Sequence, residues 1–266
     1  MGYFLLKLRK FLTLFLLSKF CFSQTIICTT SILSSVVKDI AKDKVNVKTL
    51  VPPGICPGHF DIKIEDLKDI EKEGFIFAQG YEPYLEKIKK NIENPYFKIV
   101  LIETEGNSLL PKNQKIIYRK IFDEMAKIFP AYKEYFLKNF KTAEKEIDKI
   151  DKKIKEGEKF LKGKKAICNK YIKDLLEYFG FEIIETYGRK EELTPEKIKE
   201  IIEKCKIKKL DIVVDNLQAG KDTGKIFAEE FKTPHVVISN FPYAFENTET
   251  LRDTLYRDFL IIIQKF

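Results

Sequence analysis

The chain has 266 residues, of which 44% are hydrophobic, and a formal net charge of +8 at pH 7. A chain of this length can bury the core of one large or two medium domains. Lysine and glutamate alternate along most of it, as on solvated helix faces, and no basic stripe forms, so we expect no nucleic-acid partner.

The first 23 residues have the layout of a secretory signal peptide. Three basic residues among the first ten precede an apolar stretch, Phe11–Leu17, and Cys21-Phe22-Ser23 offers small residues at positions −3 and −1 of a cleavage site. The apolar stretch is far shorter than the ~20 residues of a membrane-spanning helix. We therefore predict a signal peptide over residues 1–23, with export to the periplasm or the cell exterior.

The remainder alternates short apolar strands with amphipathic helices, in two runs. In the first run we predict strands at Thr25–Thr29, Val45–Val51, Phe75–Ala78 and Lys98–Ile102, and helices at Ile32–Ala41, 63–73 and Glu82–Ile92. In the second run we predict strands at Lys165–Cys168, Phe181–Glu185, Leu210–Val214 and His235–Ser239, and helices near 169–179, 194–205, 222–231 and 247–265. This alternation predicts an α/β fold of two lobes, residues 24–129 and 162–266, each with a parallel sheet flanked by helices.

One long helix is predicted between the lobes, over residues 130–161. Pro130 suits its first turn. Apolar residues then recur at spacings of four and three, in one stripe about eight turns long. A single stripe fits a spine helix packed along its own lobes, and a coiled-coil helix for a partner chain is the alternative. Two α/β lobes on one helix is the plan of solute-binding proteins that clamp a ligand with little hinge motion.

Ligands of open parallel sheets bind beyond the carboxyl ends of the strands. In the first lobe the strand ending at Val51 leads into Pro52-Pro53-Gly54-Ile55-Cys56-Pro57-Gly58-His59-Phe60. A thiol and an imidazole three residues apart are donors that zinc-like ions prefer. Cys56 and His59 are therefore candidate metal ligands. The alternative is a structural turn with a buried cysteine and a surface histidine.

In the second lobe, Cys168 and Asn169 end the first strand and Asn240 ends the last. We predict that Asn240 and either Cys168 or Asn169 complete a metal site with Cys56 and His59. Asn107, Asp215, Asn216 and Gln218 also follow or end strands. We expect them around the ligands, although such residues often only close turns.

The remaining histidine and cysteines are expected to be structural. His235 begins its strand, at the opposite edge of the sheet from the predicted site, and Cys28 and Cys205 fit a core thiol and a helix-end thiol. In an oxidising compartment a Cys28–Cys56 or Cys56–Cys168 disulfide is an alternative. The segment 220–225 is no P-loop, because only three residues separate its glycines and Ile226 stands where Ser or Thr would bind magnesium.

Several of these segments, over residues 25–266, resemble the ZnuA/TroA-like solute-binding proteins of zinc and manganese ABC importers. The resemblance rests on Ile26–Val37, Pro52–Phe60, Gly80-Tyr81-Glu82-Pro83-Tyr84-Leu85, the spine helix and Tyr178-Phe179-Gly180. It implies the TroA-like fold of the helical-backbone metal receptors, a transition-metal cargo, an ABC permease as partner and no enzymatic activity. We also expect a monomer.

The resemblance further implies three histidines and one carboxylate as ligands, and this chain lacks that set. Aligned without gaps, the family's positions fall on Gly58, near Gly106, on Asn169 and on Asn240. Cysteine, histidine and asparagine lie within a residue or two of each. We interpret this as a site re-specified for a softer ion, zinc first, with copper or manganese as alternatives.

Three other functions stay open. The same fold is able to hold a chelate such as a cobalamin, a haem or a siderophore, which would need a broad, aromatic-rich cleft. A metal-free adhesin or scaffold would purify without metal. Cys56 with His59 as its base would make a nucleophile, but no orienting residue or oxyanion loop accompanies them, so no enzyme is predicted.

Overall fold

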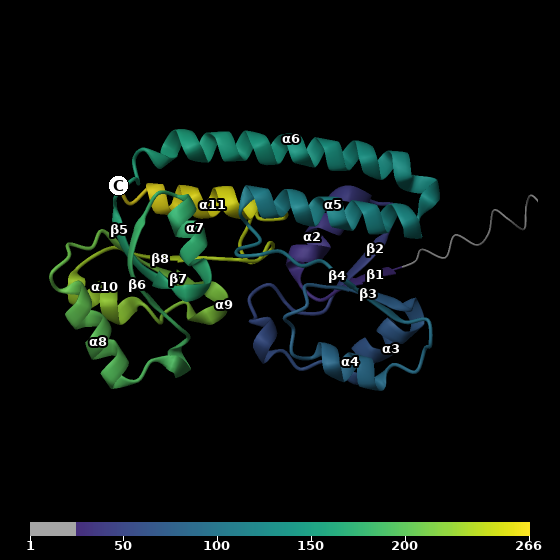
Figure 1. The fold of residues 1–266 in the computed structure, drawn as a ribbon, viewed down its shortest axis with the longest axis horizontal. Coiled ribbons are helices and arrows are strands. Elements are labelled where there is room, and N and C mark those ends of the chain that lie inside the picture. The colour runs from purple at the N-terminus through teal and green to yellow at the C-terminus, as the bar shows by residue number, and fades with distance from the viewer. Residues whose placement is uncertain (1–24) are drawn as a thin grey trace, which may run out of the picture.

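The computed structural model describes residues 25–266, so the predicted signal peptide lies outside it. Two lobes lie side by side below a layer of long helices (Figure 1). The N-terminal lobe contains β1 (Thr25–Cys28), β2 (Asn46–Thr49), β3 (Phe75–Ala78) and β4 (Lys98–Leu101). The C-terminal lobe contains β5 (Lys165–Asn169), β6 (Glu182–Tyr187), β7 (Ile212–Asn216) and β8 (His235–Ile238). The predicted two-lobed α/β fold is confirmed.

Both sheets are parallel throughout and share one pattern of strand order. The first is ordered β2-β1-β3-β4 and the second β6-β5-β7-β8. The first strand of each lobe therefore lies inside its sheet, and the chain winds outward from it in both directions. Open parallel sheets of this kind leave a crevice at the carboxyl ends of their strands.

The shorter helices cover the two sheets. They are α2 (Ser31–Ala41), α3 (Ile64–Glu73) and α4 (Leu85–Asn91) in the first lobe, and α7 (Lys173–Tyr178), α8 (Pro195–Cys205), α9 (Leu217–Gly220), α10 (Lys225–Phe231) and α11 (Leu251–Ile263) in the second. Side-chain caps set several starts: Thr194 accepts from the Lys197 amide, and Thr250 from that of Asp253. The prediction missed α9 and began the last helix four residues too early.

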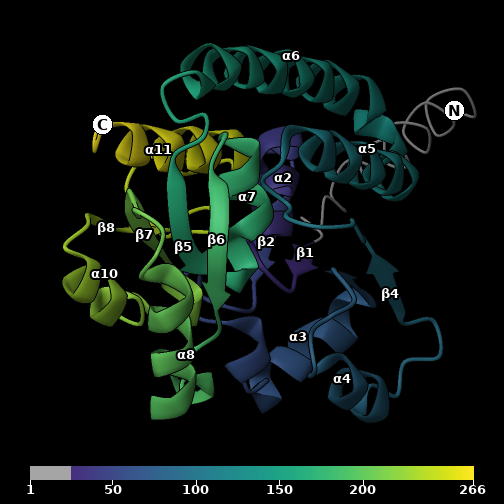
Figure 2. The ribbon, with the colours of Figure 1, turned by 60° about the vertical axis from the view of Figure 1, so that its left-hand side comes forward.

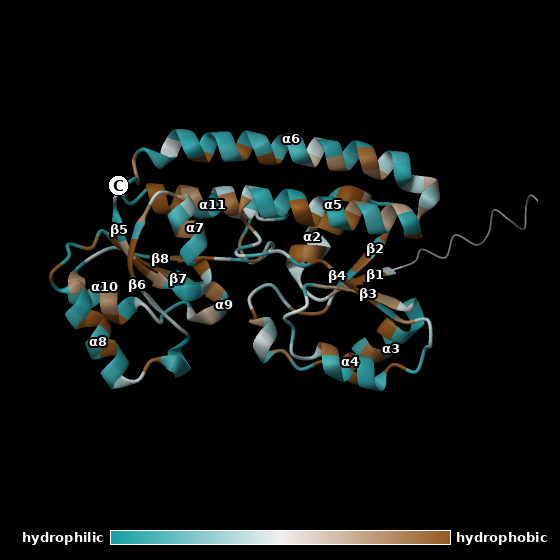
Figure 3. Ribbon diagram, in the orientation of Figure 1, coloured by the Kyte–Doolittle hydropathy of each residue, from teal (hydrophilic) through white to brown (hydrophobic). Residues whose placement is uncertain are grey.

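The spine helix is α6 (Lys133–Glu158), and a 3-10 turn, Pro130–Tyr132, replaces the first turn predicted for it. It lies above α5 (Pro111–Ile128) and α11 (Figure 2), and α5 was not predicted at all. Apolar residues alternate with hydrophilic ones along α6 (Figure 3), and Phe136, Phe140 and Ile147 of the predicted stripe are buried against the chain's own lobes. Across the α5–α6 contact, the ring of Phe140 stacks on that of Phe122 with centroids 5.2 Å apart.

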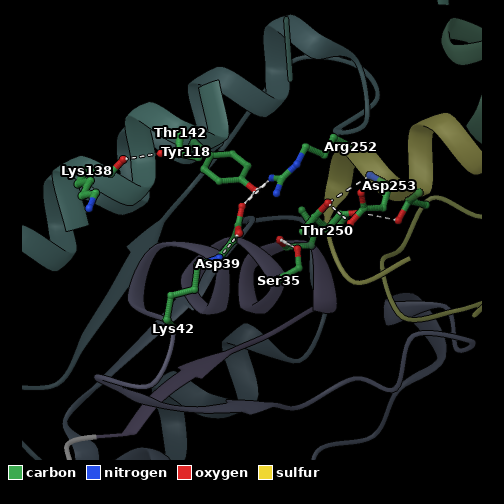
Figure 4. A network of polar contacts seen from close by, with 11 residues as sticks. Ser35, Asp39, Lys42, Tyr118, Lys138, Thr142, Thr250, Arg252 and Asp253 are labelled. Atoms are coloured by element: carbon green, nitrogen blue, oxygen red, sulfur yellow. Dashed lines mark hydrogen bonds and ion pairs between the residues drawn. The ribbon is translucent and has the colours of Figure 1, made fainter. Parts of the chain in front are cut away.

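A polar network joins the two lobes beneath the spine (Figure 4). Arg252 of α11 donates to the Asp39 carboxylate of α2 at 2.6 Å, and the Tyr118 hydroxyl of α5 donates to the same carboxylate at 2.7 Å. Burial alone would raise the pKa of Asp39, but the hydrogen bond and charge of Arg252 prevail and hold that pKa below its ordinary value. The network fixes one lobe against the other. Among residues 25–266 no helix is both long and apolar enough to cross a membrane.

Candidate functional site

A cavity of about 680 Å³ lies between the two lobes. Its walls come from the segments that follow the strands of both sheets, which is where ligands of open parallel sheets bind. Its polar and aromatic lining consists of Cys56, Tyr81, Asn107 and Ser108 from the first lobe and Lys170, Tyr171, Asp174, Arg189, Asn216, Gln218, Asn240 and Phe241 from the second. The predicted position of the binding cleft, beyond the carboxyl ends of the strands, therefore matches the position of this cavity.

Cys56 and Arg189 meet across this cleft. Cys56 precedes the 3-10 turn Pro57–His59 in the loop after β2, and Arg189 stands two residues after the end of β6. The guanidinium Nη2 of Arg189 donates to Cys56 Sγ at 2.9 Å. The guanidinium carbon also lies 5.3 Å from the ring centroid of Tyr171. A thiol from one lobe and a cation from the other thus form one pair.

Three of the predicted amide side chains tie the cleft walls together. Asn107 Nδ2 donates to Asn240 Oδ1 at 2.8 Å, from the first lobe to the second. Asn240 Nδ2 donates to the carbonyl oxygen of Tyr171 at 3.0 Å. Gln218 Nε2 donates to the carbonyl oxygen of Pro53 at 2.7 Å, again between lobes. These amides hold the two walls in register. Most of their donor and acceptor atoms already have partners within the protein.

Asn216 is different, because one of its atoms has no partner. Its Oδ1 caps α9 by accepting from the Ala219 amide at 3.0 Å. Its Nδ2 is buried without a hydrogen-bond partner, and so is Nε of Arg189. Both residues line the cavity.

Cys168 and Asn169 do not line the cavity. Cys168 is fully buried in the apolar core, and burial raises the pKa of its thiol well above the ordinary value. Asn169 is also fully buried: its Oδ1 accepts from the Tyr171 amide at 3.1 Å and its Nδ2 donates to the carbonyl oxygen of Gly188 at 3.0 Å. The end of β5 therefore closes a turn and faces the interior of its lobe.

His59 and Asp215 also lie off the cavity. The side chain of His59 is 58% exposed, and its Nε2 lies 3.6 Å from Glu191 Oε1 on the surface. Asp215 is fully buried and accepts from the Tyr187 hydroxyl at 2.7 Å. Its second oxygen contacts His235 Nε2, also at 2.7 Å, so His235 is part of an internal polar cluster, as its place at the start of β8 suggested.

The predicted ligand set is not assembled in this structure. Within residues 25–266 no three histidine, cysteine, aspartate or glutamate side chains gather as a metal-binding group. Of the five predicted ligands, Cys56 and Asn240 line the cleft, whereas His59, Cys168 and Asn169 do not. All four cysteines in the described part of the chain are free thiols, so neither disulfide alternative is formed.

Sequence reasoning missed the charged residues of the cleft. Arg189 and Lys170 were not predicted because guanidinium and ammonium groups do not ligate metals, and Asp174 was not predicted because it lies within the helix expected near 169–179. Gly58 and Gly106 lie in or near positions where the family has histidine ligands. Their surroundings explain part of the loss of that ligand set. A Cβ on Gly58 would lie 3.4 Å from Arg189 Nη2, and a Cβ on Gly106 would lie 2.8 Å from Asp174 Oδ2. Charged side chains of the second lobe occupy the space in front of both glycines.

The two lobes, the spine helix and the cleft between them together define a two-lobed solute-binding protein. The chain belongs to the ZnuA family, described as "Zinc-uptake complex component A periplasmic", whose family model matches residues 26–255. The resemblance drawn from the sequence motifs is confirmed.

Individual proteins agree with this assignment. The chain is 27% identical over 211 residues, 68% of either chain, to the "Manganese ABC transporter substrate-binding lipoprotein PsaA" of Streptococcus anginosus. It is 27% identical over 239 residues, 79% of this chain and 77% of the relative, to the "Metal ABC transporter substrate-binding lipoprotein FimA" of Streptococcus parasanguinis.

Solved structures share the fold. A crystal structure of ZnuA superimposes with a TM-score of 0.78 at 17% identity, covering 91% of this chain and 98% of the other. A Cd-bound periplasmic metal binding protein from candidatus liberibacter asiaticus superimposes with a TM-score of 0.75 at 19% identity, covering 91% and 100%. The expected TroA-like fold is thereby confirmed.

Proposed function

We propose that the chain is an extracytoplasmic receptor that binds a transition-metal cargo between its lobes and delivers it to the membrane permease of an ABC importer. Family membership and the two metal-transporter relatives support this function. The observation that carries it is the cleft itself, in which Cys56 of one lobe meets a side chain of the other. The receptor acts as a monomer and catalyses no reaction.

Cys56 is the soft donor of the cleft. It is half-buried, whereas Cys28, Cys168 and Cys205 are fully buried. Thiolates favour zinc-class and copper ions over manganese, so we propose zinc as the preferred metal. Because a thiol must lose its proton to bind a metal, uptake releases a proton and weakens in acid.

The lobes are expected to move little when the cargo binds. The Asp39–Tyr118–Arg252 network links them beneath the spine, and the Asn107–Asn240 and Gln218–Pro53 hydrogen bonds link them at the cleft. Lobes linked in this way suit a receptor in which only the rim of the cleft rearranges slightly for recognition by the permease. Asn240 and Asn107 then act by placing the walls, and Cys56 by contacting the cargo.

The experiment is a metal-content measurement on protein purified under reducing conditions without chelator. We expect about one zinc-class ion per chain after reconstitution in medium that contains zinc and manganese together, and at least a tenfold loss in Cys56→Ser. Cys205→Ser, which removes a buried thiol outside the cleft, should keep its metal. A well-folded protein that takes up no metal under any condition would contradict the proposed function.

A further inference from the structure

The polar atoms that face the cleft indicate the chemical form of the cargo. Two cavity-lining residues each have a buried nitrogen atom without a partner, Arg189 Nε and Asn216 Nδ2, and both atoms are hydrogen-bond donors. Asn216 is only 2% exposed, and its Oδ1 is committed to the Ala219 amide at 3.0 Å. The amide oxygen is therefore held at the start of α9, and the amide nitrogen is the atom left without a partner. Buried donors of this kind need an acceptor, and a carboxylate oxygen of a ligand in the cavity can supply one.

The charges on the walls also disfavour a bare cation. Lys170 and Arg189 are basic and Asp174 is the acidic residue among the lining side chains. The Arg189 guanidinium already sits 2.9 Å from Cys56 Sγ, where a divalent ion bound to the thiolate would stand. Like charges at such a distance repel strongly in a partly desolvated site. A naked zinc ion would further need three or four protein ligands, and the described residues do not gather them.

The cavity has the size and walls of a small-molecule site. Its volume of about 680 Å³ falls within the range of roughly 300–1,000 Å³ typical of such pockets. Tyr81, Tyr171 and Phe241 line it with aromatic surface, which covers the organic part of a ligand. A single ion fills only a small fraction of this space.

We propose that the metal enters the cleft as an anionic chelate with a small polycarboxylic acid, whose carboxylate oxygens accept hydrogen bonds from Arg189 and Asn216. This inference rests on the proposed function and specifies the form of its cargo. Most of the metal's ligands then come from the small molecule, so the chain needs no group of three metal-binding side chains. Arginine suits this role because its planar guanidinium matches a carboxylate.

A citrate titration at fixed total zinc tests the proposal, because the amount of zinc retained by the protein should rise for one form of the cargo and fall for the other. Equilibrium dialysis of the purified protein against zinc chloride, at a concentration that fills about a tenth of the sites when citrate is absent, measures the zinc retained as citrate is raised from zero to tenfold excess. A receptor for the bare ion loses zinc, because citrate competes for it. A receptor for the complex gains zinc, and we expect at least a fivefold rise.

The outcomes separate this inference from the proposed function. A fall in retained zinc overturns the chelate and leaves the metal-receptor function intact. No retained zinc with or without citrate overturns both. Citrate that binds equally well without zinc also overturns both, since the cleft would then hold a carboxylate without a metal cargo.

Two variants sharpen the test. Asn216→Asp keeps the oxygen that caps α9 and exchanges the free donor for an acceptor, so citrate-dependent zinc retention should fall at least tenfold. If the cleft held a bare ion, the added carboxylate would strengthen zinc binding, which would overturn the proposal. Arg189→Gln should also lose at least tenfold, and Arg189→Lys less. Lys112→Gln, which removes an exposed positive charge outside the cleft, should change nothing.

Discussion

The two lobes share a strand order but carry different chemistry on matching loops. β2 and β6 are the outer strands at equivalent places, and the loops after them present Cys56 and Arg189 to the same cleft. The loops after the other outer strands, β4 and β8, present Asn107 and Asn240, which bond to each other. A duplicated architecture thus brings matched loops together, and the residue on each loop decides what the cleft can hold.

The lobes also differ in the direction in which the pKa of a buried aspartate is shifted. In the first lobe, the Asp39 carboxylate accepts hydrogen bonds from Arg252 and Tyr118. Its pKa lies below the ordinary value, since these interactions outweigh the effect of burial. Asp258 in the second lobe is fully buried, and burial raises its pKa to about 7 despite the neighbouring Arg257. One carboxylate stabilises the fold when ionised, whereas the other destabilises it.

The largest expected effect comes from removing the partner of Asp39. Arg252→Gln removes the less exposed of the two cations that pair with the Asp39 carboxylate, whose side chain is only 7% exposed, so the free energy of unfolding at pH 7 should fall by about 2–4 kcal/mol. Urea unfolding followed by circular dichroism measures this. Lys42→Gln is the matched control, because Lys42 bonds the same carboxylate from a side chain that is 50% exposed. It should cost under about 0.5 kcal/mol, and equal losses in the two variants would contradict a special role for Arg252.

The second expected effect is a pH dependence from Asp258. Its pKa of about 7 in the folded chain is raised above the ordinary value near 4. Its favourable contribution is therefore fully present below pH 4 and is lost as the pH rises through 7. Asp258→Asn, whose amide oxygen can still accept from the Ser239 amide, should gain stability relative to the parent by about 1–3 kcal/mol between pH 5 and pH 8. Parallel stability curves for parent and variant over this range would rule out the shift.

Much of the fold is readable from the sequence because short apolar runs bounded by turns define parallel strands well. α5 was missed although Ile117, Tyr118, Ile121, Phe122 and Met125 recur at helical spacing and Pro111 marks its start. Its exposed face is rich in lysine, and the buried Asn113 and Gln114 interrupt the apolar pattern. The helical spacing was therefore present in the sequence, and the two buried polar residues obscured it.

The location of the cleft was predictable, but its residues were only partly so. The rule that ligands bind beyond the carboxyl ends of parallel strands identifies a loop. It does not say which side chain of that loop faces the ligand. Cys168 lies within β5 and enters the core, whereas Lys170 lies past the end of the strand, in the 3-10 turn Lys170–Ile172, and lines the cleft. Arg189 was overlooked for a chemical reason, since guanidinium groups do not bind metals.

Cys56 and Cys168 were both candidate metal ligands in the sequence, but their replacement should affect stability differently. Cys168 is fully buried among apolar side chains, so Cys168→Ser places a hydroxyl in the core and should lower the free energy of unfolding by about 1–3 kcal/mol. Cys56 is half-buried beside solvent and Arg189, so Cys56→Ser should change stability by less than about 0.5 kcal/mol. The same urea experiment compares them.

Thiol labelling of the folded protein completes this contrast. Among residues 25–266, a negatively charged aromatic disulfide reagent should modify one thiol quickly, at Cys56, because Cys28, Cys168 and Cys205 are fully buried. The positive charge of the Arg189 guanidinium, 2.9 Å from Cys56 Sγ, attracts a negatively charged reagent to this thiol, so Arg189→Gln should slow labelling several-fold. Labelling of Cys56 that is equally fast in Arg189→Gln would show that the contact between the lobes does not control the thiol, and so would weaken the case that matched loops set the chemistry of the cleft.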